Sequence, residues 1–101
     1  MSSGSSSDLT QLSELVRKFV QERDWERYHS PKNLAAALAV EAAELQEIYL
    51  WRELDDPVDD KRSQIEGEVA DIAICLLNFC NRTDIALGEV VRKKLVEAAE
   101  K

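Results

Sequence analysis

The sequence predicts an all-α protein with a four-helix-bundle-like fold, and three observations support this. Only three Gly and two Pro interrupt 101 residues. Charged residues make up 33% and hydrophobic residues 45% of the chain, a balance typical of a helical domain. Apolar residues recur every three or four positions in four segments. We therefore expect almost no strand, and helices at about 8–23, 32–54, 60–82 and 86–100.

The first helix is expected to start at Asp8, whose carboxylate can cap it while Gln11 reaches back in a capping box. One face of this helix is apolar, formed by Leu9, Leu12, Leu15, Val16, Phe19 and Val20. The serine-rich residues 1–7 have neither a basic nor an apolar signal region and are expected to form a flexible tail. A single helical domain would then cover residues 8–101.

The second helix follows a connector, residues 24–29, in which aromatic rings are expected to be exposed. Ser30 and Pro31 form a strong helix start, because serine supplies a cap oxygen and proline suits the first helical position. The apolar stripe of this helix runs through Leu34, Leu38, Glu41, Leu45 and Ile48. Glu41 thus occupies an apolar position, where a carboxylate needs a partner.

The third and fourth helices lie beyond a loop around Pro57. The third has an apolar stripe through Ile65, Val69, Ile72, Leu76 and Phe79. From residue 69 to residue 79 it is apolar on most of its circumference, which favours burial in a homodimer or homotetramer. Residues 82–84 break the pattern, and the fourth helix then carries Val90, Val91 and Leu95.

The charge and hydropathy patterns exclude several classes of partner. The formal net charge of -7 argues against a nucleic-acid polymer as ligand. No apolar stretch approaches the roughly 20 residues of a membrane span, so we expect no membrane partner and a cytoplasmic location. Cys75 and Cys80 lie in an apolar run without metal-ligand spacing, which indicates reduced thiols.

Four acidic residues form two i,i+3 pairs, Glu41 with Glu44 and Glu68 with Asp71, placed symmetrically about Asp56. If the flanking helices fold back antiparallel at the loop, both pairs reach the same height, because the rise per residue is equal in both arms. The four carboxylates would then face one another and hold one or two hard cations, of which Mg²⁺ is best suited. An all-oxygen donor set disfavours zinc, and the absence of Glu-x-x-His motifs disfavours carboxylate-bridged iron.

Spacing alone leaves a second interpretation open, because Glu-x-x-Glu pairs are common on solvated helix faces. Two features favour the metal site: the symmetry about the loop and the place of Glu41 in the apolar stripe. A bound Mg²⁺ that contacts phosphate oxygens suits phosphoanhydride hydrolysis.

Glu41-Ala-Ala-Glu44 and Glu68-Val-Ala-Asp71 resemble the signature of the MazG-like all-α nucleoside triphosphate pyrophosphohydrolases. The segments around Trp25, around His29 to Leu34 and at Trp51 are similar to the dCTP pyrophosphatase branch. The resemblance covers about residues 12 to 95. It implies a MazG-type fold, an oligomer, and Mg²⁺-dependent cleavage of (deoxy)nucleoside triphosphates between the α and β phosphates. It also implies a role in removing selected dNTPs from the pool.

The resemblance implies that the four acids are the metal ligands and the catalytic residues, and that Trp25 and Trp51 contribute to a base pocket. Each tryptophan could instead be a packing residue, and His29 could contact the nucleotide or only hold its turn. The remaining candidates for substrate binding are Lys32, Asn78 and Lys94.

The fourth helix departs from the family pattern. Relatives often carry an asparagine four residues after the lysine at Lys94, where this chain has Ala98, and then a Lys-Tyr-Pro-like segment, whereas this chain ends at Lys101. Substrate preference could therefore differ from the dCTP type. The alternative function is a noncatalytic helical dimer that binds nucleotide or a protein partner.

Overall fold

The computed structural model describes residues 7–100 and confirms the predicted all-α class. Within that range there is no strand. The helices are α1 (Asp8–Glu22), α2 (Pro31–Tyr49), α3 (Arg62–Thr83) and α4 (Leu87–Ala99), with short 3₁₀ turns η1 (Glu26–Tyr28) and η2 (Asp59–Lys61). Except for Ser7, the predicted N-terminal tail lies outside the described residues, and so does Lys101.

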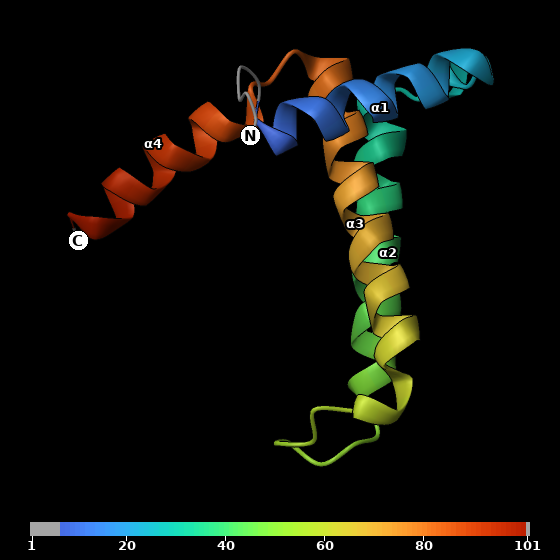
Figure 1. The fold of residues 1–101 in the computed structure, drawn as a ribbon, viewed down its shortest axis with the longest axis vertical. Coiled ribbons are helices and arrows are strands. Elements are labelled where there is room, and N and C mark those ends of the chain that lie inside the picture. Colours follow the sequence, from blue (N-terminus) through green and yellow to red (C-terminus); the bar gives the residue numbers. More distant parts are fainter. Residues whose placement is uncertain (1–6, 101) are drawn as a thin grey trace.

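The centre of the structure is an antiparallel pair of long helices, α2 and α3 (Figure 1). Helix α1 crosses this pair near the start of α2 and the end of α3 (Figure 1). Helix α4 extends away from the pair, and the loop that joins α2 to α3 lies at the opposite end (Figure 1). The described helices include none that is both long enough and apolar enough to span a membrane.

The start of α1 differs from the sequence prediction in the identity of its cap. Ser7, and not Asp8, is the N-cap, and its hydroxyl oxygen accepts a hydrogen bond from the Thr10 N–H at 3.0 Å. Asp8 is the first helical residue, where its negative charge favours the positive end of the helix dipole. The short serine side chain can approach the first-turn amides from outside the helix, which is the geometry that an N-cap requires.

Helix α2 begins where the sequence indicates but ends five residues earlier than predicted. Ser30 caps it by accepting from the Asn33 N–H at 3.1 Å, with Pro31 in the first position. Its predicted stripe is confirmed, since Leu34 and Ile48 are buried and the three residues between them in the stripe are half-buried. The helix ends at Tyr49 because the chain turns there, with Arg52 N–H donating to the Tyr49 carbonyl oxygen at 3.0 Å.

Helix α3 packs on a face slightly rotated from the predicted stripe. Leu77 and Cys80 are its buried residues, whereas Val69 in the predicted stripe is 52% exposed. The cysteine prediction is confirmed, since both thiols are free, Cys80 buried and Cys75 half-buried. The broad apolar circumference explains the difference, because more than one face of such a helix can pack against α2 and α1.

Apolar side chains remain exposed on α1 and α4 in the single chain. On α1, Leu12, Leu15 and Phe19 are exposed, and on α4 the exposed residues are Val90, Val91, Leu95 and Val96. Where such side chains form a contiguous patch, they mark a site of association in soluble proteins. The predicted connector is also exposed, with Trp25 and Tyr28 both accessible.

Candidate metal centre

Three of the four predicted acids meet between α2 and α3. Glu41 and Glu44 project from α2 and Glu68 projects from α3, and one carboxylate oxygen of each lies within 4.8 Å of the others. Glu41 and Glu44 are neighbours because residues three apart lie on one helix face. Glu68 reaches them because α3 runs antiparallel to α2. The spacing in the sequence therefore corresponds to a juxtaposition of three of the four acids in space.

The environment of Glu41 and Glu68 penalises their negative charge. Desolvation and then the charge of Glu44 raise the pKa of the Glu68 carboxyl. Desolvation, Glu44 and Asp71 likewise raise the pKa of the Glu41 carboxyl. Both groups are half-buried. The cluster is thus strained by its own charge when no cation is present.

One oxygen of the cluster is buried and has no partner. Glu68 Oε2 makes no hydrogen bond with any described residue. A buried acceptor in that state is costly unless something satisfies it. A cation placed among the three carboxylates would supply the missing partner and offset the repulsion. Glu68 is therefore the residue whose surroundings point most directly to a bound ion.

Asp71 lies at the edge of the cluster. It is exposed and is not among the three acids whose oxygens converge. Its charge still contributes to the raised pKa of Glu41, Glu68 and the Cys75 thiol. Burial is the main cause of the raised pKa of the Cys75 thiol, and the charges of Glu41 and Asp71 add to it. Cys75 thus lies beside the acids as a protonated thiol. A role for Asp71 as a ligand remains a prediction.

Two predicted substrate residues contact each other at the far end of α3. Asn78 Nδ2 lies 3.0 Å from His29 Nδ1, and the Trp25 ring lies edge-on to His29 with 6.4 Å between ring centroids. His29 and Asn78 line a hollow of about 210 Å³ together with Arg17 and Arg82. Neither arginine could be identified from the sequence, because the two stand 65 residues apart and line the same hollow only where α1 crosses α3.

The two tryptophans do not meet within one chain. Trp25 precedes α2 and Trp51 follows it, so a helix of 19 residues, roughly 30 Å long, separates them. Trp51 is 89% exposed, which rules out a core role in the single chain. Lys32 is exposed in the first turn of α2, and Lys94 is exposed on α4, which extends away from α2 and α3.

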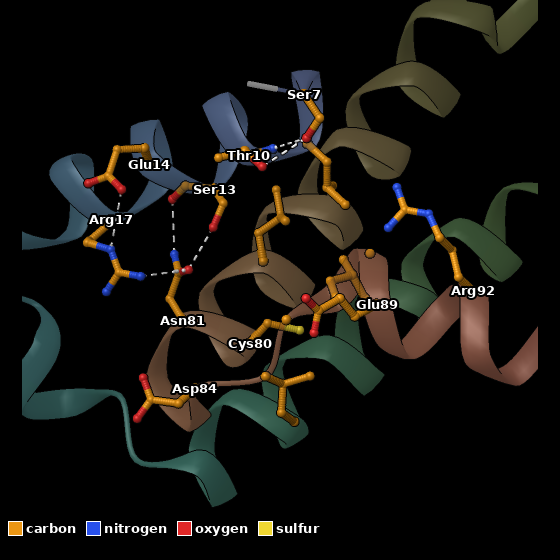
Figure 2. A pocket seen from close by; sticks show the side chains of 16 residues that line it. Ser7, Thr10, Ser13, Glu14, Arg17, Cys80, Asn81, Asp84, Glu89 and Arg92 are labelled. Atoms are coloured by element: carbon orange, nitrogen blue, oxygen red, sulfur yellow. Dashed lines mark hydrogen bonds and ion pairs between the residues drawn. The ribbon is translucent and has the colours of Figure 1, made fainter. Parts of the chain in front are cut away.

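A second hollow, of about 530 Å³, opens where α1, the end of α3 and the start of α4 meet (Figure 2). None of the four predicted acids lines it. Its wall is ordered by Asn81, whose Oδ1 accepts from Ser13 Oγ at 2.7 Å and from Arg17 at 3.2 Å. The Asn81 contacts hold α1 against α3, and the hollow is separate from the carboxylate cluster between α2 and α3.

The fold and the carboxylate cluster together define an all-helical protein with a candidate divalent-cation site on an antiparallel helix pair. No protein-family model matches the sequence. A pyrophosphatase from Archaeoglobus fulgidus has a similar structure, with a TM-score of 0.87 and 32% identity over 94% of this chain and 92% of that one.

Curated relatives point in the same direction. The dCTP pyrophosphatase 1 of Bos taurus is 33% identical over 92 residues, and that of Homo sapiens is 32% identical over 92 residues. These matches cover 86% of this chain and 54% of the relatives, so the chain spans about half of their length. The chain belongs to the MazG-like all-α nucleoside triphosphate pyrophosphohydrolases.

Proposed function

We propose that this protein is a Mg²⁺-dependent nucleoside triphosphate pyrophosphohydrolase that cleaves the α–β anhydride to give a nucleoside monophosphate and pyrophosphate. The observation that carries the proposal is the meeting of Glu41, Glu44 and Glu68, with Glu68 Oε2 buried and unpaired. The family to which the chain belongs supports the same reaction.

The donor set fits Mg²⁺, since every group offers oxygen and none offers nitrogen or sulfur. Glu41, Glu44 and Glu68 would hold the ion, with Asp71 at the edge completing the set. When bound, Mg²⁺ would neutralise phosphate charge and lower the pKa of a water molecule. The helices contribute by fixing the carboxylates before substrate arrives, which lowers the cost of organising the site.

We propose that the substrates are (deoxy)nucleoside triphosphates with a preference close to that of dCTP, and that the biological task is the removal of selected dNTPs. The support is the name of the relatives, dCTP pyrophosphatase 1. Trp25 and His29 would contact the base or sugar near the start of α2, with Asn78 beside them. Lys32 and Lys94 are the weaker candidates for contacts with phosphate.

The active form is proposed to be a homodimer or homotetramer. Trp25 and Trp51 lie at opposite ends of α2, so one base could contact both only if the second ring came from another subunit. The exposed apolar residues of α1 and α4 supply a surface for such association.

A panel of dNTPs incubated with Mg²⁺ and separated by anion-exchange chromatography tests the function. We expect turnover in the wild type and a loss of at least about 100-fold in Glu41→Gln and Asp71→Asn, because each removes charge from the cation site with little change of shape. Glu66→Gln, an exposed acid on the same helix as Glu68, is the matched control. Binding of dNTPs without any turnover would support the noncatalytic module instead.

A further inference from the structure

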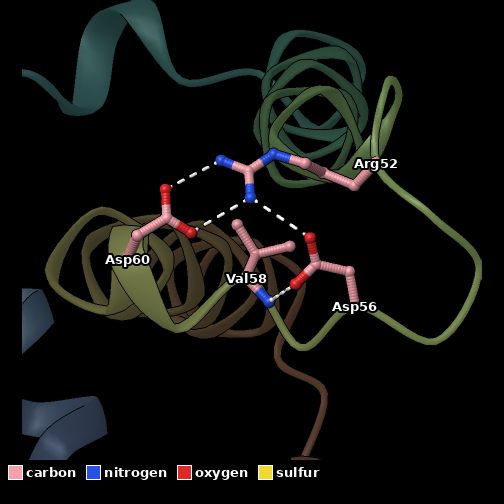
Figure 3. A network of polar contacts seen from close by, with 4 residues as sticks. All are labelled: Arg52, Asp56, Val58 and Asp60. Atoms are coloured by element: carbon pink, nitrogen blue, oxygen red, sulfur yellow. Dashed lines mark hydrogen bonds and ion pairs between the residues drawn. The ribbon is translucent and has the colours of Figure 1, made fainter.

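A single arginine joins both sides of the loop between α2 and α3. Figure 3 shows the Arg52 guanidinium between two carboxylates. Its Nη2 donates to Asp60 Oδ2 at 2.8 Å, and its Nη1 donates to Asp60 Oδ1 at 3.0 Å and to Asp56 Oδ2 at 3.2 Å. This bidentate contact with Asp60 is the geometry in which arginine binds carboxylates most strongly.

The loop held by Arg52 contains a residue with an unusual backbone conformation. Asp56 Oδ1 accepts from the Val58 N–H at 2.8 Å. Val58 is fully buried and has φ 55° and ψ 47°, in the left-handed region that β-branched residues avoid. Such a conformation persists only where the surrounding contacts fix it. The Arg52 and Asp56 side chains are 29% and 32% exposed, so this ion pair is less solvated than an ordinary surface pair.

The contact between Arg52 and Asp60 lies just beyond the two helices and at the same sequence separation from the acids on both sides. Arg52 stands eight residues after Glu44, and Asp60 stands eight residues before Glu68. The two arms between this contact and the carboxylates are therefore equal in number of residues. A slip of one residue in either arm would move its acids by about 1.5 Å along the helix axis, which is enough to change which oxygens converge.

Repulsion among the acids acts against the close packing of α2 and α3. Glu41, Glu44 and Glu68 are of like charge and within 4.8 Å of one another, so without a cation they push the two helices apart. An attractive contact at the closed end of the hairpin resists that separation. Arg52 cannot at the same time bind a phosphate through the edges that Asp56 and Asp60 occupy.

We infer that Arg52, through Asp60 and Asp56, is a positioning residue that sets the register of α2 against α3 and so preorganises the carboxylate site for Mg²⁺. The inference rests on the proposed function for the identity of the ion. The ordering of the helix pair by Arg52 does not depend on that identity.

The test compares Arg52→Gln, Arg52→Lys and Asp60→Asn with the wild type. Arg62→Gln is the matched control, because it breaks another i,i+4 arginine–carboxylate pair, Arg62 with Glu66 at 3.2 Å, close to the same loop. Two readouts are needed: the Mg²⁺ concentration that gives half-maximal dNTP hydrolysis, and hydrogen–deuterium exchange of residues 41–44 and 68–71 without metal.

We expect Arg52→Gln and Asp60→Asn to raise the half-saturating Mg²⁺ concentration about tenfold and to speed amide exchange in both acidic segments. Arg52→Lys should give values of both readouts between those of these variants and the wild type, because lysine keeps the charge but cannot make the bidentate contact. Arg62→Gln should change neither readout by more than about twofold.

Two results would overturn the inference. One is an Arg52→Gln protein that melts at a lower temperature but keeps the wild-type Mg²⁺ dependence. The other is unchanged exchange in residues 41–44 and 68–71. If the wild type shows no hydrolysis with Mg²⁺, the proposed function fails, and the exchange measurement still decides the role of Arg52.

Discussion

The raised pKa values of the Glu41 and Glu68 carboxyl groups have a consequence for the stability of the protein. Each carboxyl binds its proton more tightly in the folded state than in the unfolded chain. The stability linked to this proton is therefore fully present below the ordinary pKa of 4.5 and is lost as pH rises through the raised pKa.

This sign gives a prediction for the metal-free protein. In EDTA, Glu68→Gln should become progressively more stable than the wild type as pH rises above about 4.5, because glutamine removes the unfavourable charge. Added Mg²⁺ should narrow or reverse the difference, since it stabilises only the protein that has the full set of acids. Urea unfolding from pH 4 to pH 8 measures both effects. A difference between the two proteins that does not depend on pH would contradict the assigned environment of Glu68.

Trp51 is the residue whose exposure decides between its two interpretations. Because its side chain is 89% exposed, Trp51→Ala should change the free energy of unfolding of the single chain by less than about 0.5 kcal/mol. If the ring stacks on the base, KM for the preferred dNTP should rise at least about fivefold, since such stacking contributes about 1 to 3 kcal/mol. A large drop in melting temperature with unchanged KM would instead assign Trp51 to a subunit interface.

At the scale of the helices, the start of α2 positions the His29 segment and depends on one cap. Ser30→Ala removes the oxygen that accepts from the Asn33 N–H at 3.1 Å. We expect a loss of about 1 kcal/mol in the free energy of unfolding, or a melting temperature lower by about 4 to 8 °C. Ser63→Ala, exposed in the first turn of α3, is the control. Equal effects of the two substitutions would show that the cap has no special role.

The helices also show what the sequence could and could not predict. The meeting of acids from α2 and α3 could be predicted on the condition that the two helices are antiparallel, because the heights of the acids depend only on helical period and rise. The predicted end of α2 lies five residues beyond the observed one. Residues 50–54 have good helix propensity, but in the structure they belong to the loop in which Arg52 contacts Asp56 and Asp60. Propensity does not include such tertiary contacts. The left-handed Val58 has no local signal either, because valine normally avoids that conformation.

Some residues of the site could likewise be identified from the sequence, and others could not. Glu41 could be identified because a carboxylate interrupts an apolar stripe. Arg17 and Arg82 could not, because their approach depends on where α1 crosses α3, and neither belongs to a motif. The position of Asp71 outside the three converging carboxylates could not be predicted either, because it depends on side-chain directions that sequence spacing does not specify.

At the scale of the whole molecule, the exposed apolar side chains of α1 and α4 predict self-association. Leu95 on α4 is 63% exposed. If it lies in an interface, Leu95→Glu should raise the dissociation constant at least about tenfold, because burial of a leucine contributes about 2 kcal/mol. Sedimentation velocity over a range of concentrations measures this, with Glu97→Gln as a charge control on the same helix. A wild type that stays monomeric at high concentration would contradict the proposed oligomer.

The proposed function depends on which phosphoanhydride bond is broken, and ³¹P NMR of the products identifies that bond. With dCTP and Mg²⁺, we expect dCMP and pyrophosphate in equal amounts, and no product with Glu68→Gln under the same conditions. The appearance of dCDP and inorganic phosphate, or the absence of any product from every dNTP, would contradict it.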